Sequence, residues 1–144
     1  MNNVVIAQDP HTLSLCLDVR RRVFVDECGV AAEIERDGND VTNGACEHFL
    51  ITRDGAPVGA LRCCFDNGVV RLQRFCVLAE HRKSGLGRTA VEFVERYYRQ
   101  KGAERAELDA KCSSQGFYES CGYSVVSEQF VEAGVLHVKM LKEI

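Results

Sequence analysis

The stretch VLAEHRKSGLGRTAVEFVERYY (residues 77–98) joins an apolar strand to an amphipathic helix through a cationic turn that contains two glycines. The first turn of a helix leaves backbone N–H groups unpaired and carries a partial positive charge, so it attracts anions. Gly85 and Gly87 carry no Cβ, which would let an anion approach the backbone closely. The stretch therefore predicts a strand, an anion-binding turn and a helix, in that order.

Basic side chains surround this turn. Arginine pairs its N–H groups with phosphate oxygens, which makes a pyrophosphate the expected ligand. The alternative is a solvated helix start with ordinary surface charges. The predicted phosphate contacts are Arg82, Lys83, Ser84, Gly85, Leu86, Gly87 and Arg88.

Two other phosphate motifs fit less well. No G-x-x-x-x-G-K-[ST] loop occurs in the chain. Gly85-x-Gly87-x-x-Ala90 matches the dinucleotide fingerprint, and Asp109 follows at roughly the spacing of its ribose-binding acid. The preceding strands, however, are predicted to be linked by hairpins, and polar or small residues (79–84) separate the strand from the first glycine. Dinucleotide binding is the weaker alternative.

Composition limits the classes of function. The 144 residues predict one domain, and a net charge of -3 argues against a general nucleic-acid binder. No apolar run approaches the roughly 18 residues that cross a bilayer, and the N-terminus lacks a secretory pattern. We therefore expect a cytoplasmic protein that binds neither nucleic acid nor membrane.

The eight cysteines contain no C-x-x-C pair, and only Cys63 and Cys64 are close in sequence. Zinc ribbons and fingers need ligand pairs two to four residues apart, so no metal site is expected. In a chain without a signal peptide, reduced thiols that fill small apolar sites are the main expectation. A metal or disulfide framework is the alternative.

The order of predicted elements is β-α-β-β-β-α-β-α-β-β. Asp54-Gly55 and Asn67-Gly68 separate apolar runs, which is the strongest short-range signal for hairpins and predicts a three-stranded meander. The elements are a strand at 3–8, a helix from 10 to about 25, a loop at 28–45 with one helical turn, strands at 46–53, 56–65 and 69–78, a helix that begins near 86 and stops at 102, a strand at 104–110, a short helix at 113–122 and two strands around 132–134.

The segment at 76–98 strongly resembles the acetyl-CoA-binding segment of the GNAT superfamily of N-acetyltransferases, whose signature is [QR]-x-x-G-x-[GA]. GFYESCGY (116–123) resembles a later motif of the same superfamily. RRRVFVDECGV (20–30), FVEAGVLH (130–137) and the isolated His48 further resemble the ElaA-like or YjcF-like branch. Cys28 stands where that branch commonly has glutamine, so a substrate contact of that glutamine is not carried over.

The resemblance covers nearly the whole chain and implies a fold and a cofactor. The fold would be α/β, a mixed, mostly antiparallel sheet of about seven strands that splays between strands 4 and 5. The pantetheine arm of acetyl-CoA would lie in that gap, and the N–H near Val77 would polarise the thioester carbonyl. The implied cofactor contacts beyond the phosphate turn are Phe75, Cys76, Val77, Ser113, Ser114 and Phe117. For the two serines, a helix-capping role is an equal alternative.

The resemblance also implies catalytic roles. Tyr118 matches the usual general acid, which protonates the departing thiolate; its alternative is a core aromatic. An amine nucleophile must lose a proton before attack, and Glu27, His48 and His137 are the candidate bases. For His137 a structural role is the alternative. Arg74 and His48 are candidate acceptor contacts, although Arg74 is equally a solvated strand residue.

These inferences predict an acetyl-CoA-dependent N-acetyltransferase that acts on a small primary amine by direct attack in a ternary complex, as a monomer or homodimer and without a metal. A non-catalytic acyl-CoA-binding module of the same fold is the main alternative. The acidic residues of the 28–45 loop indicate either a cationic acceptor or a solvated loop. They are Glu33, Glu35, Asp37 and Asp40.

Overall fold

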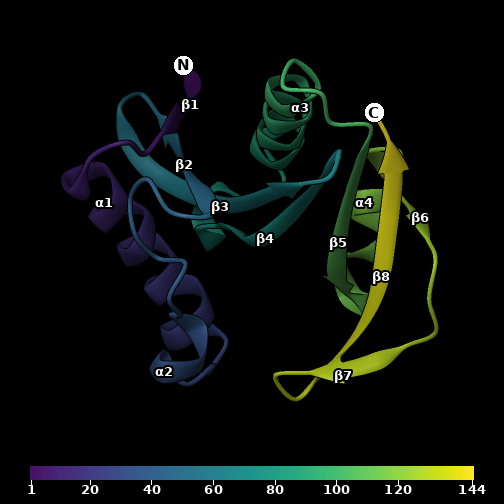
Figure 1. Cartoon of the computed structure of the whole chain (residues 1–144). Helices are drawn as coiled ribbons and strands as arrows, with labels where there is room; N and C mark the ends of the chain where they lie inside the picture. Colours follow the sequence, from purple (N-terminus) through teal and green to yellow (C-terminus); the bar gives the residue numbers. More distant parts are fainter.

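The computed structural model describes residues 1–144 and contains one sheet of eight strands flanked by helices (Figure 1). The strand order is β1-β2-β3-β4-β5-β8-β6, and β7 pairs with β8 outside this path. Only the β4–β5 pair is parallel. The strands are β1 (Asn2–Ile6), β2 (Cys46–Arg53), β3 (Ala56–Asp66), β4 (Val69–Val77), β5 (Arg105–Lys111), β6 (Ser124–Val125), β7 (Phe130–Glu132) and β8 (Val135–Glu143).

This architecture confirms the predicted fold class. The two-residue β6 was not predicted, because so short a strand carries no periodicity. The helical elements are α1 (Pro10–Arg20), the π-helical η1 (Arg21–Glu27), α2 (Ala32–Glu35), the 3-10 turn η2 (Ala79–His81), α3 (Leu86–Arg99), the 3-10 turn η3 (Cys112–Ser114) and α4 (Gln115–Ser120). No helix combines the length and the apolar composition that a membrane crossing needs.

The meander β2-β3-β4 forms as the turn residues predict. Asp54 and Gly55 have φ values of 50° and 82°, and Asn67 and Gly68 have φ values of 49° and 76°. Two consecutive positive φ values make a hairpin turn whose twist matches the strands that it joins, and Asp-Gly and Asn-Gly adopt it most readily.

The first helix differs in part from its prediction. Asp9 caps α1 as expected, since its carboxylate accepts the N–H of Thr12 at 2.8 Å and Pro10 follows in the first turn. The regular helix ends at Arg20, whereas one helix to about residue 25 was expected. Wider turns continue the chain to Glu27, with the Cys28 N–H bonded to the Val23 carbonyl at 2.9 Å.

Two apolar clusters hold helices to opposite faces of the strands, and Figure 1 shows α1 and α3 on either side of β2, β3 and β4. The buried side of α3, including Val94 and Tyr98, belongs to the larger cluster. Leu13 and Val19 of α1 belong to the smaller one, together with Cys76 of β4. Phe75 and Val77 pack against the larger cluster, because successive strand residues face opposite sides.

The sheet splays between β4 and β5. Their pairing runs only from Val69–Arg105 to Leu72–Leu108, although both strands continue beyond it. Just past this point Arg74 has a φ of 52°, and the β3–β4 register shifts between Ala60 and Arg62. A bulge of this kind bends the strand that carries it and interrupts its pairing. The free ends of β4 and β5 therefore face each other without strand hydrogen bonds.

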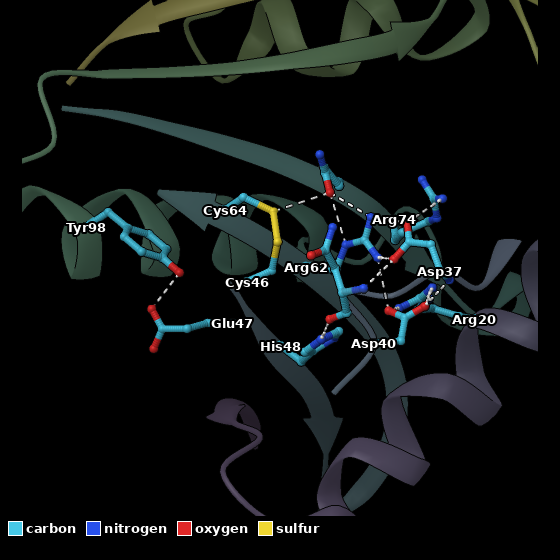
Figure 2. The surroundings of a disulfide bond; sticks show 12 residues. Arg20, Asp37, Asp40, Cys46, Glu47, His48, Arg62, Cys64, Arg74 and Tyr98 are labelled. Atoms are coloured by element: carbon cyan, nitrogen blue, oxygen red, sulfur yellow. Dashed lines mark hydrogen bonds and ion pairs between the residues drawn. A yellow bond between two sulfur atoms is a disulfide. The ribbon is translucent and has the colours of Figure 1, made fainter. Parts of the chain in front are cut away.

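The prediction that all eight cysteines are reduced is wrong for one pair. Cys46 and Cys64 form a disulfide between β2 and β3, as Figure 2 shows. They are direct cross-strand partners with Cα atoms 4.4 Å apart, which places the two thiols within bonding reach. The other six cysteines are free.

Candidate active site at the splayed strands

The first turn of α3 offers open backbone donors. Gly85 precedes the helix with a φ of 85°, and the N–H of Thr89 makes the first intrahelical bond, to the Gly85 carbonyl at 3.1 Å. The N–H groups between them have no partner four residues back, and no side chain caps them. No atom lies within 4 Å of the position that a Cβ on Gly85 would occupy. This is the open, partly positive helix end that the sequence predicted.

The cations around this turn are less free than predicted. Arg82 forms a bidentate ion pair with Glu27 of η1, at 2.7 and 2.8 Å, and its Nε donates to the Val77 carbonyl at 2.8 Å. Arg88 turns to the end of α4, where it donates to the Ser120 carbonyl at 2.9 Å. Lys83 is exposed. The turn therefore offers its open backbone N–H groups together with the side-chain donors that these contacts leave over, rather than a ring of free guanidinium groups.

An aromatic wall joins the turn to the end of β4 and to α4. A Cβ on Gly87 would lie 3.0 Å from the ring of Phe117. The ring centroid of Phe117 is 6.2 Å from that of Phe75 and 5.0 Å from that of Tyr118. Phe75 of the predicted cofactor strand therefore lies beside Phe117 and Tyr118 of the later motif at 116–123.

The Tyr118 hydroxyl is the one tyrosine hydroxyl in the chain that makes no hydrogen bond to another residue. Those of Tyr97 and Tyr98 donate to Glu47, and that of Tyr123 donates to Glu95, each at 2.8 Å. Burial, followed by the nearby thiols of Cys121 and Cys76, raises the pKa of Tyr118. The group stays protonated at neutral pH and has a proton to donate.

The backbone of Val77 points into the splay. The N–H of Leu78 bonds to the Val58 carbonyl of β3 at 2.8 Å. Because backbone groups alternate in direction along a strand, the N–H and carbonyl of Val77 point away from β3. The Val77 carbonyl accepts from Arg82, as described. The pairing of β4 with β5 ends at Leu72, before Val77. The N–H of Val77 therefore has no strand partner on the β5 side.

On the other rim of the splay, the end of β5 meets η1. Lys111 is the cross-strand partner of His137, and its ammonium lies 3.8 Å from the sulfur of Cys28. His137 is mostly buried; its Nδ1 lies 2.8 Å from the Val135 carbonyl and its ring stacks on Phe130. Hydrogen bonds from Arg82 lower the pKa of Glu27 on the same rim.

His48 and Arg74 lie away from this group of residues and hold the 28–45 loop. His48 is 2% exposed, and its Nε2 lies 2.9 Å from the Asn39 carbonyl. Arg74 donates to the Glu35 carbonyl at 3.0 Å. The side chain of Arg74 is 30% exposed, and its guanidinium also lies 3.7 Å from the Glu35 carboxylate and 3.6 Å from that of Asp37.

The acidic loop is neither a free cation-binding surface nor a solvated loop. Arg20 is 1% exposed and donates to the carboxylates of Glu35 and Asp40, both at 2.7 Å. Arg62 donates to Asp37 at 2.7 Å and to Asp40 at 3.0 Å. Figure 2 shows Arg20, Arg62, Asp37 and Asp40 converging beside the disulfide. Glu33 alone among the four acidic residues remains exposed outside this network.

The remaining predicted contacts are placed as follows. Ser113 and Ser114 precede α4, and neither makes a side-chain cap. The hydroxyl of Ser84 donates to the His81 carbonyl at 2.6 Å. The Cys76 thiol is buried on the α1 side of the strand, and burial raises its pKa to about 12. Leu86 is buried and anchors the first turn of α3.

Two features outside the splay bear on the choice of site. No group of three or more His, Cys, Asp or Glu side chains converges as metal ligands would. A surface pocket of about 370 Å³ lies at the opposite end of the sheet, between the β3–β4 turn and the C-terminus, and contains none of the predicted residues. Its lining is mostly polar.

Sequence reasoning missed the Glu27–Arg82 pair and the buried arginine network. The partners in the pair are 55 positions apart, and those in the network are 15 to 25 apart. The only local signal was the coincidence of several arginines with an unusually acidic loop in a chain of near-balanced charge.

Comparisons with known proteins agree with this geometry. Residues 20–144 match the family described as Acetyltransferase (GNAT) domain. The uncharacterized N-acetyltransferase YjcF of Bacillus subtilis (strain 168) is 36% identical over 140 residues, which cover 96% of this chain and 98% of that protein.

Solved structures show the same fold. A candidate N-acetyltransferase from Lactobacillus plantarum has a TM-score of 0.91 at 28% identity, covering 99% of this chain and 97% of that one. Escherichia coli ElaA has a TM-score of 0.84 at 24% identity, covering 99% and 100%. An aminoglycoside 6'-N-acetyltransferase complexed with coenzyme A has a TM-score of 0.78 at 15% identity, covering 99% and 96%. With the family match spanning most of its length, this chain belongs to the GNAT family of N-acetyltransferases.

Proposed function

We propose that this enzyme transfers an acetyl group from acetyl-CoA to the primary amine of a small molecule, with both substrates bound together. The observation that carries the proposal is the unpaired hydroxyl of Tyr118, held in the same aromatic cluster as Phe75 of β4. A protein that only binds a thioester has no need of a protonated, unpartnered hydroxyl beside the end of that strand.

The cofactor would lie across the splay. Its pyrophosphate would bind the open N–H groups of the first turn of α3, where an anion is favoured and the backbone is uncovered. Its pantetheine arm would follow Phe75, Cys76 and Val77, where β4 has lost its β5 partner. A GNAT-fold protein solved with coenzyme A supports this choice of ligand.

The reaction would be a direct displacement. The amine nitrogen attacks the thioester carbonyl carbon, and the outward-facing N–H of Val77 stabilises the oxyanion that forms. The C–S bond then breaks, and the sulfur takes the proton of Tyr118. The buried thiol of Cys76 takes no part, because burial keeps it protonated and it faces the α1 cluster.

The attacking amine must lose a proton, and His137 is the group that we assign to accept it. When Nδ1 donates to the Val135 carbonyl, 2.8 Å away, Nε2 carries the lone pair, and the Glu132 carboxylate 3.8 Å from Nε2 would stabilise the ring once it is protonated. The carboxylate of Glu27, by contrast, already has both oxygens bonded to Arg82.

A binding measurement and an acceptor screen test the proposal. Calorimetry should show acetyl-CoA binding, with NAD and NADP weak or absent; the reverse order would favour a dinucleotide-binding protein. A panel of amines incubated with acetyl-CoA and the enzyme should yield acetylated products by mass spectrometry. Binding without turnover across a broad panel would instead identify a CoA-binding module.

A further inference from the structure

The Glu27–Arg82 pair links two parts of the site that are far apart in sequence. Glu27 ends η1, on the rim where the amine would enter, and Arg82 opens the phosphate-binding turn. Both carboxylate oxygens accept from the guanidinium, at 2.7 and 2.8 Å. Two parallel N–H···O bonds fix the relative orientation of two groups as well as their distance.

The Nε of Arg82 donates to β4. The acceptor is the Val77 carbonyl at 2.8 Å, so one side chain spans η1, the end of β4 and the turn. A guanidinium has five N–H groups, and three are committed within the protein. Arg82 is therefore a fixed part of the frame around the turn, and only two of its N–H groups remain for a ligand.

The pair also decides what Glu27 can do chemically. A carboxylate that accepts two charge-assisted bonds binds a proton less readily, and these bonds lower the pKa of Glu27. An amine nucleophile has a pKa of about 10, so a carboxylate with a lowered pKa is a poor acceptor for its proton. The same contacts make Glu27 well suited to hold a cation in place.

We propose, on the basis of the proposed acetyl-CoA function, that Glu27 is a positioning residue for the cofactor: it holds Arg82 against the end of β4, and through Arg82 it sets the phosphate-binding turn. The catalytic proton is accepted elsewhere. Loss of Glu27 then weakens cofactor binding through Arg82 and leaves the proton transfer intact.

The chain offers a matched control one residue away. Asp26 lies on the same π-helical segment, with its side chain 53% exposed against 42% for Glu27, and it pairs with Arg21 at 2.7 Å instead of with the turn. Removing its charge changes the electrostatics of η1 without touching Arg82. The variants are Glu27→Ala, Glu27→Gln, Arg82→Ala, the double variant Glu27→Ala/Arg82→Ala, and Asp26→Asn.

Calorimetry with coenzyme A as the probe tests whether Glu27 affects cofactor binding through Arg82. Glu27→Ala should weaken binding roughly two- to fivefold, the range for an exposed pair of good geometry, and Glu27→Gln should weaken it less because one acceptor oxygen remains. In the Arg82→Ala background the further change to Glu27→Ala should have no effect. Asp26→Asn should bind as wild type. An equal loss from Glu27→Ala in both backgrounds would overturn the proposal.

Turnover separates positioning from proton transfer. With an acceptor found in the screen, the acidic limb of the pH profile of kcat should stay in place in Glu27→Gln. A fall of about 10²–10⁴ in kcat with loss of that limb, and unchanged coenzyme A affinity, would make Glu27 the base and overturn the proposal. Wild-type protein that binds no coenzyme A would overturn the proposed function first, whatever the variants do.

Discussion

Gly87 lies directly against Phe117: a Cβ on this glycine would stand 3.0 Å from the edge of the aromatic ring. Phe75 lies 3.6 Å from the same point. The absence of a side chain at residue 87 thus lets the first turn of α3 and the aromatic wall pack together. A substitution at Gly87 therefore acts on the aromatic wall as well as on the turn before α3.

We predict that Gly87→Ala lowers acetyl-CoA affinity about tenfold, because Phe117 must move by a few tenths of an ångström and shifts the wall beside Tyr118. Calorimetry measures the change, and near-ultraviolet circular dichroism reports the aromatic packing. Gly38→Ala is the matched control, since no atom lies within 4 Å of the added methyl group and its φ is not positive. Unchanged affinity in Gly87→Ala would show that the phosphate lies elsewhere.

The buried arginine network predicts a large loss of stability. Arg20→Met would leave the carboxylates of Glu35 and Asp40 without their partner in the protein interior, and breaking a buried pair in this way costs about 3–5 kcal/mol. Urea unfolding measures the loss. Arg21→Met is the neighbouring control, because its ion pairs with Asp18 and Asp26 are half exposed. Equal effects of the two changes would mean that the network adds no more than a surface pair.

The same network predicts sensitivity to acid. Burial alone would raise the pKa of Asp40, but hydrogen bonds from Arg20 and from the Asp37 backbone outweigh it and lower that pKa. A carboxylate whose pKa is lowered by folding stabilises the protein above its unfolded pKa of about 3.9, and this contribution is lost as the pH falls. We expect the free energy of unfolding to fall below about pH 4.

Asp40→Asn serves as the reference for this titration. The variant should be less stable than wild type at pH 7, and the difference should narrow in acid because Asp40 of unfolded wild type takes up a proton there, whereas asparagine does not titrate. A constant difference between pH 7 and pH 3 would contradict the assignment to Asp40.

The sequence predicted well what local chemistry decides. The turns Asp54-Gly55 and Asn67-Gly68 fold as hairpins because their backbone preference is intrinsic. The helical spacing of apolar residues predicts α3. Asp9 before Pro10 predicts the N-cap of α1. The open turn before α3 could be predicted because its glycines and the helix start lie within one short segment.

Pairings across the fold could not be predicted in the same way. From the sequence, Arg74 was equally suited to contact an acceptor or to lie in solvent. Its contact with the Glu35 carbonyl depends on the β3–β4 register and on a loop that is distant in sequence. The strand pattern around His48 does not predict that its ring would contact the Asn39 carbonyl of a distant loop. The Cys46–Cys64 bond needs the exact β2–β3 register, which the sequence gives only through the position of the turn.

The disulfide predicts a measurable contribution to stability. It closes a loop with a sequence separation of 18 that includes β2, the β2–β3 turn and β3 as far as Cys64. A loop of this length is worth about 3 kcal/mol in the chain-entropy account. Cys46→Ala/Cys64→Ala should lose about this free energy of unfolding under oxidising conditions and nothing under reducing ones. Peptide mapping without reduction should find the two cysteines linked; eight free thiols in the oxidised, unfolded protein would refute the bond.

The last prediction concerns Tyr118, the tyrosine whose hydroxyl has no partner in the protein. Tyr118→Phe keeps the ring contacts with Phe75 and Phe117 and removes only the hydroxyl. If this group protonates the departing thiolate, turnover should fall about 10²–10⁴-fold. Acetyl-CoA affinity should change little, because the hydroxyl acts mainly as charge develops on sulfur.

Tyr97→Phe is the matched control for this variant. Its hydroxyl also lies on a partly buried ring, but it donates to Glu47, which Tyr98 still bonds when Tyr97 is changed. Turnover with an amine found in the screen, measured beside calorimetry, should separate the two variants. Equal turnover in Tyr118→Phe and Tyr97→Phe would remove Tyr118 from the mechanism, and the thiolate would then have to leave with a proton from water.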